Sequence, residues 1–153
     1  MGKRLTAMLA GALALAAIAG CGGSDSEESL SKAQYIKQGD AICQEAYDEY
    51  QSEYDAYAKE HGIKKGAFPS RKQLYEVMEE FYIPSREARL AGLQELNPPS
   101  ADEDEVEAIL AATEDGLEKA NKNAQLLFGE TPYPFEKAND LSTAYGFEVC
   151  NAT

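Results

Sequence analysis

The stretch that decides the fold is residues 31–60, SKAQYIKQGDAICQEAYDEYQSEYDAYAKE. Its apolar residues recur at 35/36, 42/43, 46/47, 50, 54 and 57, which is the spacing of one face of an α-helix. Ser31 and Gln34 stand at the spacing of a capping box, and the pair His61-Gly62 is typical of a helix end. The sequence therefore predicts a helix over 31–60, roughly 45 Å long at 1.5 Å per residue.

Three further helices are predicted after this one. Ser70 and Gln73 again have capping-box spacing, and an apolar face follows to residue 96. Pro84 lies inside that pattern, so we expect a kink near 81–84 or two helices that meet there. A third helix is expected over 100–128 and a short fourth over 135–145, ended by Gly146. The prediction is an all-α fold, an antiparallel bundle of about four helices. The inward residues expected on the second helix are Leu74, Val77/Met78, Phe81, Ala88, Leu93 and Leu96.

The N-terminus has the layout of an export leader. Lys3 and Arg4 precede 15 uncharged residues at 5–19, which is too short for the roughly 20 residues of a spanning helix and fits a secretory signal. Ile18-Ala19-Gly20-Cys21 resembles a bacterial lipobox, which implies a lipid on Cys21. We therefore expect a signal peptide at 1–20, an acidic flexible spacer at 21–30, and a helical domain at 31–153, lipid-anchored to the outer face of the cell membrane. A retained anchor and an unlipidated secretory signal are the alternatives.

The charge of the chain limits its partners. The formal net charge is −13 and falls to about −15 when residues 1–20, which contain two basic residues and no acid, are removed. Binding to nucleic acid depends on Lys and Arg that neutralise phosphates, so a nucleic-acid partner is not expected. The partners expected are the membrane, through the lipid on Cys21, and an envelope protein or a glycan.

Two cysteines remain beside Cys21. An exported chain meets an oxidising environment, so Cys43 and Cys150 predict a disulfide; two separately buried thiols are the alternative. Several short motifs are spread along the chain, namely the leader, Asp40-Ala41-Ile42-Cys43, Leu96-Asn97-Pro98-Pro99 and Tyr145-Gly146-Phe147-Glu148-Val149-Cys150. Together they resemble a group of small secreted or lipid-anchored helical proteins of actinobacteria that has no established activity. The resemblance implies the pairing of Cys43 with Cys150 and leaves the function open.

The sequence lacks the residue sets of the common active sites. A single histidine, His61, is too few for a di-iron bundle, and the acidic run at 102–107 does not match a calcium loop. No phosphate-binding or dinucleotide-binding glycine pattern occurs, so neither a metal nor a cofactor is expected. The expected function is a noncatalytic binding or structural module. The alternatives are a glycan-cleaving enzyme that uses two carboxylates and an inhibitor or regulator of a secreted partner.

One feature is a candidate binding surface. Tyr47, Tyr50, Tyr54 and Tyr57 are spaced 3, 4 and 3 and so share one stripe of the first helix. They form either part of the core or an exposed aromatic groove, since a tyrosine combines an apolar ring with a hydroxyl that needs a partner. Because the fourth helix is short, we expect Tyr47 and Tyr50 to be buried and Tyr54 and Tyr57 to be more exposed.

Overall fold

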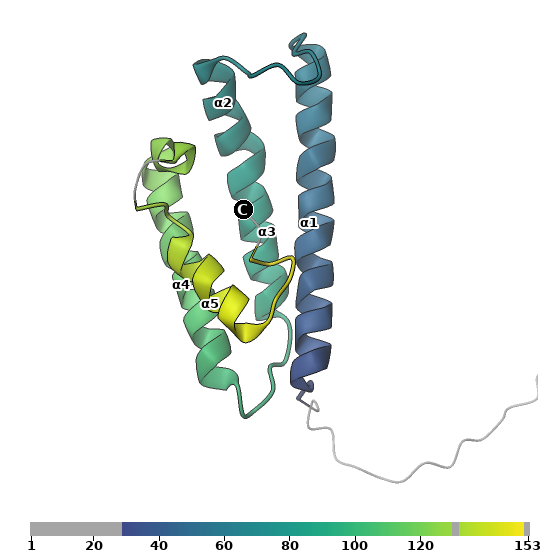
Figure 1. Cartoon of the computed structure of the whole chain (residues 1–153), viewed down its shortest axis with the longest axis vertical. Coiled ribbons are helices and arrows are strands. Elements are labelled where there is room, and N and C mark those ends of the chain that lie inside the picture. Colours follow the sequence, from purple (N-terminus) through teal and green to yellow (C-terminus); the bar gives the residue numbers. More distant parts are fainter. Residues whose placement is uncertain (1–28, 130–131, 152–153) are drawn as a thin grey trace, which may run out of the picture.

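The computed structural model describes residues 29–129 and 132–151 and confirms the all-α prediction (Figure 1). Helices α2, η1 and α3 follow one another without a break, so the bundle has four helices. No strand occurs in the described part of the chain. The elements are α1 (Lys32–Glu60), α2 (Arg71–Val77), the π-helical turn η1 (Met78–Tyr82), α3 (Ile83–Gln94), α4 (Glu103–Lys122), the 3-10 helix η2 (Ala124–Phe128) and α5 (Glu136–Tyr145).

The helix ends form as their sequences predict. At the starts of α1 and α2, the side chains of Ser31 and Ser70 accept the backbone N–H three residues on, which completes two capping boxes. At the end of α5, Gly146 takes the left-handed conformation with a φ of 113°. Its N–H and that of Phe147 donate to carbonyls of the last turn of α5, the pattern of a Schellman motif.

Pro84 changes the helix that contains it. Proline has no N–H and crowds the carbonyl four residues earlier, and η1 is the turn immediately before it. There the N–H of Ile83 donates to the carbonyl of Met78, five residues back. The interruption expected at 81–84 is therefore a π-helical turn, which changes the inward face of α3. Ala88, expected inside, is exposed, whereas Arg86, Arg89 and Leu90 are buried.

The third predicted helix ends earlier than expected. α4 stops at Lys122, and Asn123 has an extended backbone whose side chain accepts the N–H of Gln125. Asparagine side chains compete in this way with helical hydrogen bonds. The apolar residues at 124–128 therefore lie on η2, which turns aside from the axis of α4 (Figure 1).

The helices pack in a fixed order. α3 packs between α1 and α4, and α5 packs on α4 (Figure 1). The core divides into two clusters. One lies near the start of α1 and contains Tyr35, Cys43, Leu93, Val106, Ile109, Tyr145, Phe147 and Cys150. The other is built around Ile83, Leu90, Leu117, Ala120, Ala124 and Phe135.

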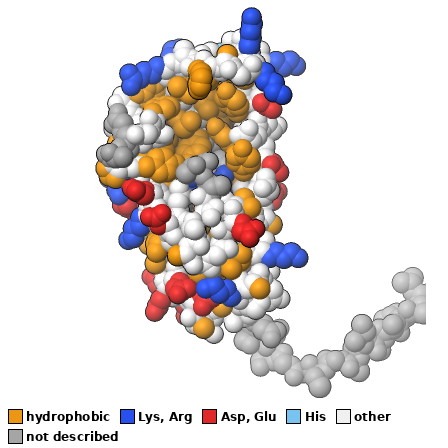
Figure 2. Space-filling view, viewed as in Figure 1, with side chains coloured by type: hydrophobic (Ala, Val, Ile, Leu, Met, Phe, Trp, Pro, Cys, Tyr) orange, Lys and Arg blue, Asp and Glu red, His pale blue; other side chains and the backbone are white. Residues whose placement is uncertain are grey.

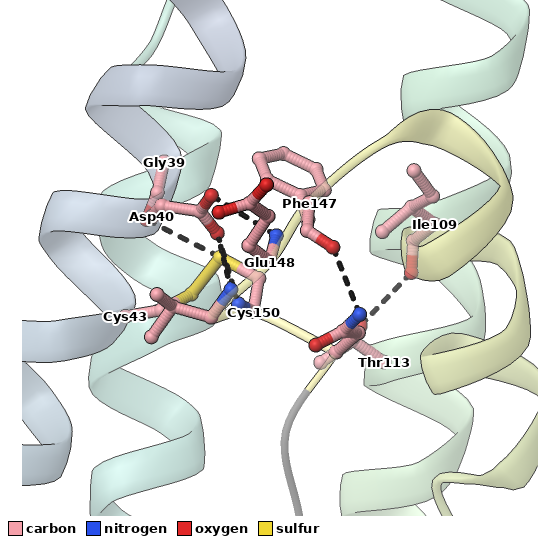
Figure 3. The surroundings of a disulfide bond; sticks show 10 residues. Gly39, Asp40, Cys43, Ile109, Thr113, Phe147, Glu148 and Cys150 are labelled. Atoms are coloured by element: carbon pink, nitrogen blue, oxygen red, sulfur yellow. Dashed lines mark hydrogen bonds between the residues drawn. A yellow bond between two sulfur atoms is a disulfide. The ribbon is translucent and has the colours of Figure 1, made fainter.

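The segment after α5 crosses back to α1, where it is fixed twice (Figure 3). Cys43 and Cys150 form a disulfide, with Cα atoms 5.2 Å apart, which confirms the predicted pair. One turn earlier, the carboxylate of Asp40 accepts the backbone N–H groups of Glu148, Val149 and Cys150 at 3.0, 2.8 and 3.1 Å. The disulfide joins residues that are 107 positions apart in the sequence. Because it restricts the unfolded chain, a closed loop of this length corresponds to about 4.7 kcal/mol of stabilisation.

Close packing requires a glycine beside this attachment. A Cβ built on Gly39 would lie 2.6 Å from the Phe147 ring and 2.9 Å from the Leu93 side chain. The missing side chain lets the Phe147 ring lie against the backbone of α1. Phe147 is buried there and contacts Tyr35, with 6.0 Å between ring centroids.

The three hydrogen bonds to Asp40 predict a large loss from a small change. Asp40→Asn replaces one acceptor oxygen with an NH₂ group that faces backbone donors, so we expect a loss of about 2–3 kcal/mol in the free energy of unfolding. Urea denaturation of the oxidised protein measures it. The control is Asp55→Asn, at an exposed position of the same helix, which should change the stability by less than about 0.5 kcal/mol. Equal effects of the two substitutions would contradict the role of Asp40.

Candidate functional site

The exposure of the tyrosine stripe runs opposite to the prediction. Tyr47 is exposed, with 40% of its surface accessible, Tyr50 and Tyr54 are half-buried, and Tyr57 is 6% accessible. The expectation that Tyr47 and Tyr50 are buried and Tyr54 and Tyr57 more exposed is therefore wrong.

The reason lies in which helix covers α1. The expectation assumed that the short last helix packs on α1, but α5 packs on α4. The end of α1 is covered instead by α2 and η1. Tyr57 packs edge-on against Phe81 with ring centroids 5.7 Å apart, its hydroxyl donates to Glu76, and His61 stacks on it at 3.9 Å.

The exposed part of the stripe forms one wall of a groove. Tyr47 and Tyr50 face η1 and the start of the segment after η2 across an open depression of about 500 Å³, which we name the aromatic groove. Figure 2 shows hydrophobic side chains gathered on this face of the molecule. A depression of this size suits a small ligand. The lining residues are Tyr47, Tyr50, Gln51, Met78, Tyr82, Arg89, Leu127, Gly129 and Tyr133.

The rings of the groove are held by contacts with one another. Tyr82, on η1, packs edge-on against Tyr50 and Phe135, with ring centroids 5.8 and 6.4 Å away. Phe135 is fully buried and also contacts Tyr133. Edge-to-face pairs of this kind stabilise by about 0.5–1.5 kcal/mol beyond burial. The groove therefore has a wall that is formed before any ligand arrives.

Hydrogen bonds order the hydroxyls of this wall. Nε and Nη2 of Arg86 donate to the Tyr82 hydroxyl at 3.0 and 2.9 Å, and that hydroxyl lies 2.7 Å from the hydroxyl of Tyr133. An oxygen that accepts two hydrogen bonds donates its own hydrogen onward, here to Tyr133. The hydrogen of the Tyr133 hydroxyl is thereby left to bond another acceptor.

Arg89 provides the charge of the groove. Its side chain is 6% accessible, and its Nε and Nη1 have no hydrogen-bond partner within residues 29–129 and 132–151. Burial, together with the neighbouring Arg86, lowers the pKa of Arg89 to about 10, so the guanidinium is still charged at neutral pH. A buried cation without an anion lowers the stability of the fold, because the charged group loses its hydration and gains no ion pair in return.

A second groove lies around Tyr57 and contains carboxylates. It has a volume of about 500 Å³ and brings Glu53 and Glu60 of α1 opposite Glu76 and Glu80. Glu76 accepts the hydroxyl of Tyr57 and pairs with Lys72, and these contacts lower its pKa. Burial and this same bond raise the pKa of Tyr57 to about 12. Among the described residues, no group of acidic, histidine and cysteine side chains has a geometry that could hold a metal.

Sequence reasoning found part of the aromatic groove. It identified Tyr47 and Tyr50 but placed all four tyrosines of the stripe in one site, whereas Tyr54 and Tyr57 do not line this groove. It missed Tyr82, Tyr133 and Arg89. The positions of Arg86 and Arg89 were an available indication of the site. Both arginines fall on the apolar face of α3, and charged side chains are rarely buried on such a face unless they have a partner.

Comparisons of the chain with protein-family models, with curated proteins and with solved structures found no match. The functional argument therefore rests on the geometry of the grooves.

The reversed exposure predicts unequal effects along the stripe. Tyr57→Ala removes a buried ring together with its bond to Glu76, so we expect the melting temperature to fall by about 10 °C or more. Tyr47→Ala removes an exposed ring and should lower it by less than about 3 °C. Thermal unfolding followed by circular dichroism measures both, and equal losses would contradict this assignment of burial.

Proposed function

We propose that the protein is a noncatalytic binding module of the bacterial cell envelope, exported and held at the outer face of the membrane by a lipid on Cys21. The aromatic groove is its ligand site. The observation that carries the proposal is a preformed tyrosine wall beside the buried Arg89, two of whose nitrogens have no hydrogen-bond partner among the described residues, a combination that suits recognition and contributes little to folding. Its partner is an envelope molecule that fits this groove.

The anchor is supported by the leader and the lipobox resemblance at 18–21. Residues 1–28, including Cys21, lie outside the described residues. Within the described part, no helix is long and apolar enough to cross a membrane. A diacylglyceryl cysteine would supply the two chains that stable anchoring needs.

The groove lies far along α1 from the end that would be tethered. The chain enters α1 at Lys32, whereas Tyr50 lies 18 residues further along the helix. At 1.5 Å per residue, this places the groove about 27 Å along α1 from its first residue.

The carboxylate groove is the observation that favours the alternative, a glycan-cleaving enzyme. Such an enzyme needs one carboxylic acid that keeps its proton and one carboxylate beside it. Glu76 is bonded to Tyr57 and Lys72, and the downward shift of its pKa is the opposite of what a general acid requires. The aromatic groove therefore supports binding better than the carboxylate groove supports hydrolysis. An inhibitor or regulator of a secreted partner would be one form of this binding function.

The anchor predicts where the protein is found. Cys21→Ala should move the protein from the membrane fraction to the culture supernatant or the soluble envelope fraction, because the lipid attachment site is lost. Fractionation of cells, with an immunoblot for the protein, measures this. Undiminished membrane retention of Cys21→Ala would contradict the lipid anchor.

The ligand site is tested by a photoreactive amino acid in living cells. Benzoylphenylalanine in place of Tyr47, at the rim of the groove, should form an adduct that mass spectrometry detects. The same residue in place of Glu45, an exposed position of the same helix that does not line the groove, should not. Identical adducts at both positions, or none at Tyr47, would contradict the aromatic groove as the site.

A further inference from the structure

We propose that the aromatic groove binds a small aromatic monocarboxylate, whose carboxylate pairs with the guanidinium of Arg89 and whose ring packs among the tyrosines. The inference rests on the proposed function, because it names the ligand class of the same groove. It is carried by the charge, the hydrogen-bonding capacity and the shape of the lining residues.

The anionic part of the ligand follows from Arg89. Two of its nitrogens are buried without a partner among the described residues, and its side chain lines the groove. A second cavity that Arg89 lines has a volume of about 20 Å³, which is room for a single water. A water there would accept a hydrogen bond but leave the charge uncompensated, whereas the aromatic groove is large enough to admit an anion.

The geometry of the donors favours a carboxylate. The planar guanidinium presents paired N–H groups that match the two oxygens of a carboxylate. The Tyr133 hydroxyl, which already accepts from Tyr82, supplies one more donor at the same groove. Burial keeps these donors away from bulk water, which strengthens their hydrogen bonds to an anion.

The charge of the ligand is limited to one. Arg86 is already bonded to Tyr82 and lies over the Phe135 ring at 4.8 Å, and among the described residues Arg89 is the one cation that lines the groove. The chain as a whole carries a net charge of −13. A ligand with several negative charges would meet this repulsion with one guanidinium to offset it. The one guanidinium and the negative net charge of the chain therefore both favour a ligand with a single negative charge.

The other lining residues of the groove indicate the chemistry of the uncharged part of the ligand. Tyrosine rings, Met78 and Leu127 form most of the wall, and Gln51 is the polar side chain besides the tyrosines and Arg89. A sugar would bring several hydroxyls to a wall that has few partners for them, and unpaired polar groups weaken binding. An aromatic ring instead packs against the tyrosines by offset or edge contacts.

Three probes test this on the full-length protein in a nonionic detergent by isothermal titration calorimetry. They are naphthalene-2-acetate, its neutral amide naphthalene-2-acetamide, and glucuronate. We expect naphthalene-2-acetate to bind at least about 10-fold more tightly than the amide, because only the acid forms a charged pair with Arg89. Glucuronate should bind more weakly than naphthalene-2-acetate by a similar factor.

Variants at position 89 test whether Arg89 causes the difference in affinity between the acid and the amide. Arg89→Met should weaken binding of the acid by about 10- to 100-fold and leave the amide unchanged. Arg89→Lys should lose part of this affinity, since an ammonium lacks the planar fork. Arg71→Met, which removes an exposed cation at the start of α2, should bind the acid as the wild type does. The melting temperature of Arg89→Met should be equal to or above that of the wild type, which a structural role of Arg89 would not allow.

Several results would overturn the inference. They are equal affinities of the wild type for acid and amide, no binding of the acid up to about 5 mM, unchanged binding by Arg89→Met, or glucuronate binding as tightly as naphthalene-2-acetate. If Arg89→Met does not fold, Arg89→Lys and the acid-to-amide ratio of the wild type decide the question. A groove-specific crosslink at Tyr47 in cells, with equal affinities for acid and amide, would overturn this inference and leave the proposed function standing.

Discussion

The attachment of the last residues to α1 is the constraint on which the rest of the bundle depends. α5 packs on α4 and reaches α1 through Tyr145, whose ring lies 6.1 Å from that of Tyr35, so the segment at 147–150 makes the main attachment of the chain end to the first helix. Asp40 supplies acceptors for three backbone N–H groups that follow the end of α5, and Cys43 adds a covalent bond one turn further on. Phe147 then fills the space that Gly39 leaves open. Charge, covalent bond and packing act together within residues 39–43 of α1 and 147–150 of the chain end.

This arrangement separates a rigid half of the molecule from a more open one. Near the start of α1, the disulfide and the cluster around Tyr35 and Phe147 close the core. Further along, α1 is covered by η1 and α2, and the segment after η2 stands apart from it across the aromatic groove. The groove exists because no helix fills this space. Arg89 is buried at its edge without compensation from the described residues, which is a loss of stability of the kind that functional sites retain.

Local features of the fold could be predicted from the sequence, and long-range ones could not. Capping boxes, the Schellman motif and the interruption at Pro84 depend on residues a few positions apart, so most helix ends were found, the end of α4 at Lys122 being the exception. The disulfide was predicted because an exported chain has few ways to use two cysteines. The exposure of Tyr47 and Tyr57, by contrast, depends on which helix packs on α1. The groove residues come from three separate segments, with Tyr47 and Tyr50 on α1, Tyr82 and Arg89 on the continuous helix of η1 and α3, and Tyr133 after η2, and periodicity in one segment does not show which others it meets.

The π-helical turn also fixes how α2 and α3 are phased about their common axis. A π-turn closes its hydrogen bond over five residues instead of four, so it takes up one extra residue while α2 and α3 keep a common phase about the helix axis. With that phase, Tyr75 on α2 meets Phe128 while Tyr82 meets Tyr133 and Phe135. A single-residue deletion within 78–82 would therefore be absorbed by closing the turn as an α-helical one, with α2 and α3 still in place, but it would change which side chains η1 presents to the aromatic groove. The extra residue of this turn thus sets which side chains, here Met78 and Tyr82, η1 directs at the groove.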